Sequence, residues 1–455
     1  MHNVDINIVD MALDIIKFAI NRVTITDPVL GFPKSEKELR AQVGETVTAK
    51  GIGGEKAFEL FREVLSRSSV SIDHRRHLAF VSAAPTRAAI MFDLVTSAAS
   101  IHGAYWMEGA GGIFAENQAM EWLVALTGMP EGAFGVFTSG GTEANLSALV
   151  AAREYWRSLS AANKTKRGVV ITSHGAHSSV RSMAKVIDVD VIYVDGEGRF
   201  EREGLDDAIR SMAPDDRDRL FAVIATAGTT NAGIIDDLEG VADICTSEKL
   251  WLHVDAAYGG AALAAPSVRH LFTGIERADS VTIDPHKWLF APYDCGAVIY
   301  RDPQLARNAH SQEGSYLDAF HGQETSGFNP SDYQIQLTRR LRGLPLWFSL
   351  AMHGTDRYVQ AIERGLELAQ IAGRVIEEHE NVELVREPSL SCVLFRRVGW
   401  EASDYDKWMI RNHRAGFALV APTKWMGETV SRFCFINPDT TEQDIVDILS
   451  TMDQL

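Results

Sequence analysis

A lysine lies between two apolar runs in the second half of the chain. In TIDPHKWLFAPYDCGAVIY, residues 282–300, Lys287 follows the run SVTI and precedes the run GAVIY. Both runs are typical of buried strands, so we expect Lys287 at the edge of the core. Burial is expected to lower the pKa of this amine, which would make it competent for Schiff-base chemistry.

An aspartate follows the apolar run LWLHV in the segment HVDAAYGG, residues 253–260. A carboxylate at the end of a buried strand is costly unless it is paired with a cation or hydrogen-bonded. Asp255 could therefore cap the following turn, or it could hold a protonated ring nitrogen.

A Gly-Gly turn leads directly into a helical pattern in TSGGTEANLSALVAARE, residues 138–154. The start of a helix offers unpaired N–H groups and a positive dipole end, so this turn could hold a phosphate or could be only a turn. It lacks the GxxxxGK[ST] and GxGxxG patterns, so nucleotide binding is not favoured.

Two histidines, His174 and His177, follow the run GVVIT. They could bind a metal, stack on a planar ring or be structural. No third ligand stands at a recognisable spacing, so no metal site is predicted and a zinc hydrolase is disfavoured. A reactive lysine, an aspartate and a phosphate cradle together meet the needs of pyridoxal phosphate, whose ring is an electron sink only while its nitrogen is protonated.

These residues follow strands that alternate with helices. The strand-like runs are 135–139, 168–173, 191–195, 220–226, 250–255, 280–284 and 296–300, and the helix-like segments include 143–156 and 204–213. Such alternation predicts an α/β domain with a largely parallel sheet, in which ligands bind beyond the carboxyl ends of the strands. Polar residues stand at several of these ends: Ser139, His174, Thr226, Asp255 and Asp284.

The two ends of the chain have other patterns. Helical patterns at 9–22 and 54–66 predict an N-terminal segment, 1–72, without a core of its own. The large domain is expected at 73–345. A long helix at 357–379, strand-like runs and a closing helix at 440–452 predict a small α+β C-terminal domain, 346–455.

The net charge of −17 argues against a nucleic-acid or anionic-membrane partner, and no apolar run is long enough to span a bilayer. The four cysteines form no disulfide or metal pattern, and the N-terminus does not resemble a signal peptide. We therefore expect a soluble cytoplasmic protein.

Three motifs, SGGTEANL, HVDAAYGG and DPHKW, resemble the group II pyridoxal-phosphate-dependent decarboxylases, the family of aromatic L-amino-acid and glutamate decarboxylases. The resemblance is strong over about 73–350. It implies that Lys287 forms the internal aldimine and that Asp255 pairs with the ring nitrogen. His177 would stack on one face of the ring and Ala257 on the other. The implied phosphate-binding positions are Gly141, Thr142, Thr230 and His286. The family often has Asn where this chain has Asp284, and a carboxylate would repel a phosphate.

The resemblance also implies decarboxylation through a quinonoid intermediate. The polar stretch 308–334 matches a mobile loop of the family that reaches the partner subunit's site, and Tyr316 matches the tyrosine that protonates the substrate carbon. The related oxygen-dependent aldehyde synthases have Phe there. One of the arginines in LTRRLRG (337–343) could serve substrate or cofactor, and the others would form ion pairs.

The substrate wall implied by the resemblance includes Ala84, Pro85 and Thr86, with a second position at Ala104 and with His102 nearby. An aromatic L-amino acid is the expected substrate, and an acidic or dibasic amino acid is the alternative. The implied fold is fold-type I, aspartate aminotransferase-like, with a mostly parallel seven-stranded sheet and a small C-terminal domain. The implied assembly is a homodimer with active sites at the subunit interface. The competing interpretations are an aldehyde synthase, another pyridoxal-phosphate lyase and a non-catalytic relative.

Overall fold

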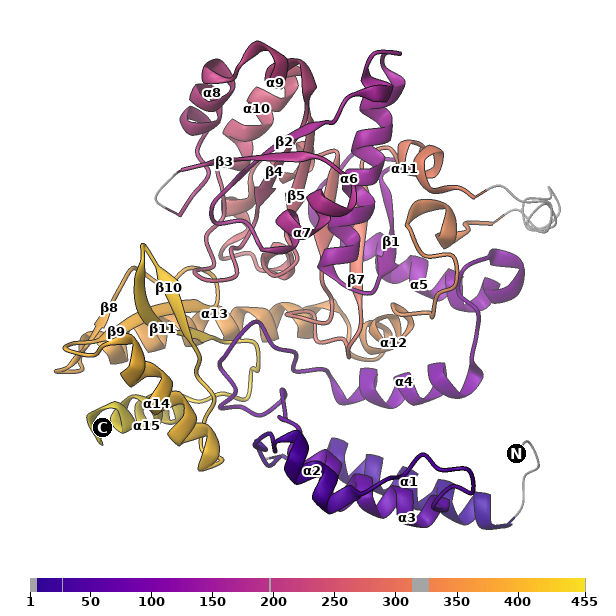
Figure 1. Ribbon diagram of the computed structural model, residues 1–455, viewed down its shortest axis with the longest axis vertical. Coiled ribbons are helices and arrows are strands. Elements are labelled where there is room, and N and C mark those ends of the chain that lie inside the picture. The colour runs from indigo at the N-terminus through magenta and orange to yellow at the C-terminus, as the bar shows by residue number, and fades with distance from the viewer. Residues whose placement is uncertain (1–5, 27, 196–197, 313–326, 455) are drawn as a thin grey trace.

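A sheet of seven strands forms the centre of the molecule (Figure 1). The computed structural model describes residues 6–26, 28–195, 198–312 and 327–454. The strand order is β1-β7-β6-β5-β4-β2-β3. The strands are β1 (Phe134–Thr138), β2 (Val169–Ser173), β3 (Asp190–Val194), β4 (Leu220–Thr226), β5 (Trp251–Asp255), β6 (Ser280–Ile283) and β7 (Gly296–Tyr300). Strand β7 is antiparallel to β1 and β6, and the other pairs are parallel. The predicted α/β fold with a mostly parallel seven-stranded sheet is confirmed.

Helices cover both faces of this sheet, which explains why most of its strands are continuous apolar runs. The helices on one face are α6 (Gly141–Ser158), α7 (Ser179–Val186) and α11 (Pro303–His310). The helices on the other face are α5 (Trp106–Thr127), α8 (Arg202–Ser211) and α10 (Leu238–Glu248). The short helix α9 (Pro214–Arg219) leads into β4.

A second, smaller sheet carries the C-terminal part of the chain (Figure 1). Its order is β10-β11-β9-β8 and all its pairs are antiparallel. Its strands are β8 (Val382–Leu384), β9 (Cys392–Arg397), β10 (Pro422–Trp425) and β11 (Glu428–Cys434). Its helices are α13 (Thr355–Glu377), α14 (Ala402–Arg414) and α15 (Glu442–Ser450), and α12 (Leu344–His353) precedes them.

The N-terminal helices lie together at one end of the molecule, beyond α4 (Arg87–Ala99) (Figure 1). They are α1 (Ile6–Thr24), α2 (Glu36–Val43) and α3 (Gly54–Leu60). Helix α1 includes the predicted 9–22, and α3 continues as a π-helical turn to Leu65, near the predicted end. The domain boundaries after residues 72 and 345 stay predictions. Within the described residues, no helix is both long enough and apolar enough to cross a membrane.

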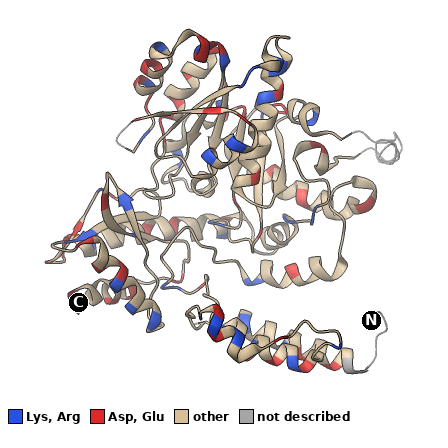
Figure 2. Ribbon diagram, in the orientation of Figure 1, with Lys and Arg blue, Asp and Glu red and all other residues tan. Residues whose placement is uncertain are grey.

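Acidic and basic side chains are interspersed over both sheets and their helices (Figure 2). The net charge of −17 is thus spread over the fold. The four cysteines are buried free thiols, and all four belong to the main hydrophobic core. They therefore act as small core residues.

Candidate active site

Lys287 lies in the turn that follows β6, at the carboxyl end of the parallel strands. Its backbone N–H donates to the carbonyl of Asp284 at 2.9 Å, which closes the turn. The next residue, Trp288, is fully buried and stacks on Tyr258 with ring centroids 5.5 Å apart. The Lys287 side chain stays 24% exposed and lines a cavity of about 330 Å³. The predicted position of Lys287 at the edge of the core agrees with this arrangement.

The Lys287 amine forms an ion pair with Asp284, and this changes its expected chemistry. Its Nζ lies 2.8 Å from Asp284 Oδ2. Burial lowers the pKa of Lys287, but the carboxylates of Asp284 and Asp255 and the nearby Tyr293 raise it, and the net shift is upward. The expectation of a lowered pKa is therefore wrong, because it considered burial without the carboxylate three residues earlier in the chain.

Asp255 ends β5 and faces the same cavity. Its side chain is almost fully buried, and two donors hold it. The N–H of Ala257 donates to Oδ1 at 3.1 Å, and Asn145 Nδ2 donates to Oδ2 at 2.8 Å. Hydrogen bonds to a carboxylate favour its charged form. The geometry therefore suits a partner that carries a positive charge, such as a protonated ring nitrogen.

The start of α6 supplies the third part of the cavity. No side chain caps this end, so the N–H groups of the first turn are available to an anion. Glycine suits position 141, because a Cβ atom there would lie 2.9 Å from Asp284 Oδ2 and would force that side chain to shift. Thr142 lines the cavity beside it.

The remaining predicted cofactor positions lie on loops around this cavity. His177 lines it, and the N–H of Ser179 donates to its Nδ1 at 3.2 Å. Thr230 and Ala257 line it as well. His286 accepts from the N–H of Cys295 at 3.0 Å through Nδ1. Burial and the Lys287 cation lower the pKa of His286, so a neutral ring is favoured. The structure thus brings all the predicted cofactor positions together.

His174 does not line this cavity. Its ring stacks on Tyr193 with centroids 5.1 Å apart, and its Nε2 lies 3.3 Å from Asp195. Among the described residues, no cluster of three or more His, Cys, Asp or Glu side chains is placed to hold a metal ion.

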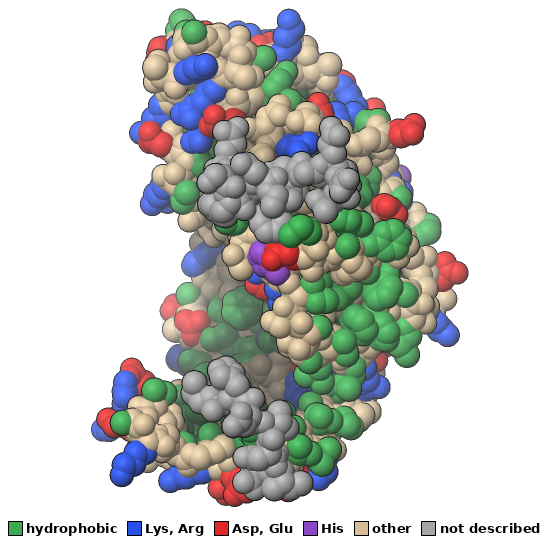
Figure 3. Space-filling model, turned by 90° about the vertical axis from the view of Figure 1, so that its right-hand side faces the viewer, with side chains coloured by type: hydrophobic (Ala, Val, Ile, Leu, Met, Phe, Trp, Pro, Cys, Tyr) green, Lys and Arg blue, Asp and Glu red, His purple; other side chains and the backbone are tan. Residues whose placement is uncertain are grey.

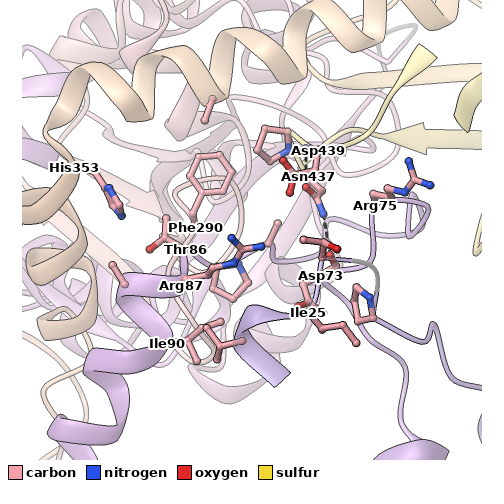
Figure 4. A pocket seen from close by; sticks show the side chains of 18 of the residues that line it. Ile25, Asp73, Arg75, Thr86, Arg87, Ile90, Phe290, His353, Asn437 and Asp439 are labelled. Carbon is pink, nitrogen blue, oxygen red and sulfur yellow. Dashed lines mark hydrogen bonds between the residues drawn. The ribbon is translucent and has the colours of Figure 1, made fainter. Parts of the chain in front are cut away.

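The predicted substrate wall lies in a different cavity (Figure 4). Ala84, Pro85 and Thr86 line this second cavity, of about 360 Å³, together with residues of the N- and C-terminal segments. The two cavities share no lining residue among those described, but one turn contributes Lys287 to the first and Phe290 to the second. The N–H of Thr86 donates to the Phe290 carbonyl at 2.9 Å. The role of these three residues stays a prediction.

The other substrate positions lie farther from Lys287. His102 pairs with Glu108, with 2.5 Å between Nδ1 and Oε2, and lines neither of these two cavities. Ala104 is fully buried against Tyr105 and Leu337. Their role as substrate contacts stays a prediction. Tyr316 lies outside the described residues.

A further cavity, of about 340 Å³, adjoins the first at Lys287, His177 and Thr230. Phe80 lines it, 62% exposed and with a positive φ of 56°, which is unusual for a bulky residue. Arg432, from β11, brings a buried guanidinium and donates to the Thr230 carbonyl.

The sequence predictions missed some of the residues that surround Lys287 and Asp255. Asn145 is a buried amide on a face of α6 that otherwise carries small apolar residues, and that contrast is visible in ANLSALVAA. Arg432 interrupts an apolar run in the same way in SRFCFI. No local pattern in the sequence indicates that Arg432 and Lys287 line one cavity, because the two residues lie far apart in the chain.

The three arginines after the loop all form ion pairs. Arg339 pairs with Glu116, Arg340 with Asp93 and Arg342 with Asp294. The predicted ion pairs are therefore present for all three, and a role for one of them toward substrate or cofactor stays a prediction.

The donor set of the first cavity fits pyridoxal phosphate. Lys287 offers an amine for the aldehyde, Asp255 a charged acceptor for the ring nitrogen, and the start of α6 its amides for the phosphate. Two buried oxygens that line the cavity, Thr226 Oγ1 and Asp284 Oδ1, have no hydrogen-bond partner within the described residues. Buried polar atoms of this kind point to a bound polar group.

Comparisons with known proteins agree with this chemistry. Residues 38–398 match the family described as the pyridoxal-dependent decarboxylase conserved domain. The chain is 31% identical over 427 residues to an aromatic-L-amino-acid decarboxylase of Bacillus atrophaeus, which covers 90% of this chain and 87% of that protein. It is 29% identical over 385 residues to an L-2,4-diaminobutyrate decarboxylase of Acinetobacter baumannii, covering 80% and 75%. The fold is similar to Oryza sativa TDC with PLP and tryptamine, with a TM-score of 0.91 and 23% identity over 100% of this chain and 99% of that one.

Proposed function

The chain belongs to the pyridoxal-dependent decarboxylase family, and from this premise we propose that it converts an aromatic L-amino acid to the corresponding amine and carbon dioxide. The family supplies the reaction class, amino-acid decarboxylation, and the cofactor, pyridoxal phosphate. The cavity beside Lys287 that contains Phe80 is the observation that carries the choice of substrate.

That cavity favours an apolar side chain. Its described lining contains Phe80, Val81, Ala421 and Pro422, and it contains no aspartate or glutamate. A dibasic substrate would need a carboxylate to pair with its second ammonium group, because an unpaired charge is costly away from water. An aromatic ring can instead stack on the exposed Phe80 ring. The described residues of this cavity therefore support an aromatic substrate over a dibasic one.

Arg432 is proposed to bind the substrate's α-carboxylate. Apart from Lys287, it is the cation among the described residues that line this cavity. Its guanidinium is held by the Thr230 carbonyl, so little side-chain entropy is lost when a carboxylate binds. An acidic substrate would add a second carboxylate, and these residues offer no further cation to pair with it.

Each residue around the cofactor has a proposed role. When bound, pyridoxal phosphate supplies an electron sink for the negative charge that develops at the substrate α-carbon as carbon dioxide leaves. Lys287 holds the cofactor through its amine, and Asp255 keeps the proton on the ring nitrogen. His177 and Ala257 pack on the two faces of the ring. Tyr316 is proposed to return a proton to the substrate carbon.

The phosphate is proposed to lie at the start of α6. Gly141 and Thr142 offer backbone N–H groups there, and Thr230 and His286 complete its surroundings. Asp284 does not oppose this anion as an isolated charge, because its Oδ2 is neutralised by Lys287. The departure from the family's Asn is thus compatible with phosphate binding.

The functional unit is proposed to be a homodimer with active sites at the interface. Helix α1 exposes Leu13, Ile16 and Ile20, which are each at least 44% exposed. Exposed apolar rows of this kind mark protein–protein contact surfaces. His102 lines neither the cofactor cavity nor the Phe80 cavity of its own chain, which fits a contribution to the partner's site.

The test is a comparison of three substrate classes on the cofactor-loaded protein. L-Phenylalanine, L-glutamate and L-2,4-diaminobutyrate are supplied separately, and carbon dioxide release and oxygen uptake are followed together. We expect the highest kcat/KM on the aromatic substrate, no oxygen uptake, and no turnover by K287A. A higher kcat/KM on either charged substrate would overturn the substrate assignment. Oxygen uptake matched to carbon dioxide would instead identify an aldehyde synthase.

A further inference from the structure

Behind Asp255, four buried side chains form a continuous line of hydrogen bonds. They are Trp251, Ser280, His253 and Asn145, and together they are called the donor chain below. Trp251 Nε1 lies 2.9 Å from Ser280 Oγ, which lies 2.8 Å from His253 Nδ1. His253 Nε2 lies 3.0 Å from Asn145 Oδ1, and Asn145 Nδ2 lies 2.8 Å from Asp255 Oδ2. All four side chains are at most 5% exposed, so water does not compete for these bonds.

The β-strand period builds this arrangement. Trp251, His253 and Asp255 are alternate residues of β5, so they share the face that α6 covers. Ser280 is the residue of β6 directly paired with His253. Asn145 reaches down from the first turns of α6, between His253 and Asp255. The sequence WLHVD thus encodes both ends of the line.

The two ends of the donor chain determine which group donates and which accepts in each of its hydrogen bonds. An indole N–H can only donate, and a carboxylate can only accept. Because Asp255 accepts, Asn145 must turn its NH₂ toward Asp255 and its carbonyl toward His253. His253 then carries its proton on Nε2 and accepts at Nδ1 from the hydroxyl of Ser280, whose lone pair accepts from Trp251.

A neutral His253 is required for this direction, and its surroundings favour that form. Burial lowers the pKa of His253 to about 4, and Asp255 and Ser280 offset this only in part. Both ring nitrogens are used, one as donor and one as acceptor. No other arrangement of protons satisfies every group in the line.

We propose that the donor chain positions Asp255 and keeps it an acceptor, so that its carboxylate stays available to hold a proton on the cofactor's ring nitrogen. This inference rests on the proposed role of Asp255. The members of the chain are positioning residues, since Asn145 acts through Asp255 and the other three act through Asn145.

The test uses W251F, which removes the first donor and keeps an aromatic ring. Trp408 provides a matched control, because its indole N–H donates to Thr451 at 2.7 Å in the C-terminal part of the chain, and W408F removes that donor alone. The measurements are the dissociation constant for pyridoxal phosphate and the pH midpoint of the bound cofactor's visible absorbance. We expect W251F to weaken binding about 3- to 10-fold and to shift the midpoint, and W408F to match the wild type.

N145D provides a second and stronger variant. It has nearly the same shape as the wild type but replaces the donor to Asp255 by an acceptor, so the two carboxylates repel one another. We expect binding to weaken by more than about tenfold. If both W251F and N145D bind the cofactor as W408F does, with the same absorbance midpoint, the donor chain has no positioning role. If the wild type itself does not bind pyridoxal phosphate, the proposed function fails together with this inference.

Discussion

At the scale of single residues, the Asp284–Lys287 pair makes a specific prediction about reactivity. The attacking form of the amine is the uncharged one, and the Asp284 carboxylate stabilises the charged one. D284N should therefore let burial lower the pKa of Lys287. We expect cofactor-free D284N to combine with pyridoxal phosphate faster than wild type at neutral pH. The midpoint of its pH–rate profile, in which the rate increases with pH, should lie at lower pH than that of the wild type. Stopped-flow absorbance across pH 6–10 measures this.

The control for D284N is D294N. Asp294 pairs with Arg342 at 3.0 Å, in the same connection between β6 and β7, and does not contact the amine. Its pH–rate profile should match that of the wild type. An unchanged midpoint in D284N would show that another group sets the protonation of Lys287.

The same residues show how much of the site is predictable from sequence. Lys287 and Asp255 stand next to apolar runs, so the cost of placing charge there is visible locally. The sign of the Lys287 pKa shift is not visible in that way, because it depends on whether Asp284 points along the turn or away from it. Arg432 is close to Lys287 only because the small sheet packs against the large domain, and no local pattern reports that contact.

At the scale of elements, a buried ion pair joins α5 to the start of α12. Arg339 donates to both oxygens of Glu116 at 2.9 and 3.1 Å, and the N–H of Gly343 donates to the same carboxylate at 2.7 Å. Neither side chain is more than 3% exposed. Removing one partner leaves an uncompensated buried charge, so we expect R339L to lower the free energy of unfolding by about 3–5 kcal/mol. Urea denaturation measures this loss.

An exposed pair serves as the comparison for R339L. Arg40 and Glu36 lie one turn apart on α2, and both side chains are more than three-quarters exposed. R40L should therefore change the free energy of unfolding by less than about 1 kcal/mol. Equal losses in R339L and R40L would mean that the buried pair adds nothing beyond surface electrostatics.

The strands are predictable at this scale, whereas some helices are not. Most strands of the central sheet are buried on both faces, so each reads as an apolar run bounded by polar residues. The residue pattern predicts neither α4 nor α5. Glycines near the start of α5 lower its helix propensity, but close packing requires them. A Cβ at Gly112 would lie 2.2 Å from Leu341 Cδ1, and one at Gly109 would lie 2.7 Å from the His102 carbonyl oxygen.

At the scale of the whole molecule, the N-terminal helices stand at one end and leave apolar side chains uncovered. Figure 3 shows a hollow between this end and the body, with hydrophobic side chains gathered on the neighbouring face. Leu94 and Val95 of α4 and Phe114 of α5 are between 44% and 56% exposed. A second copy of the chain, packed against α1, α4 and α5, would remove this surface from water.

The proposed dimer is tested by placing charge on the exposed row of α1. Leu13 and Ile16 are 49% and 47% exposed, and they lie on one face of the helix at a spacing of three residues. Burying two carboxylates in an apolar interface costs several kcal/mol, so we expect L13E/I16E to weaken the dimer by more than about tenfold. Sedimentation velocity should show monomers, and decarboxylation should fall in parallel, because each site would lose the partner's contribution.

The control is L159E, a charge at the exposed end of α6, where Leu159 is 60% exposed. A monomeric but fully active L13E/I16E would mean that one chain contains a complete site, whereas an unchanged dimer would place the interface away from α1.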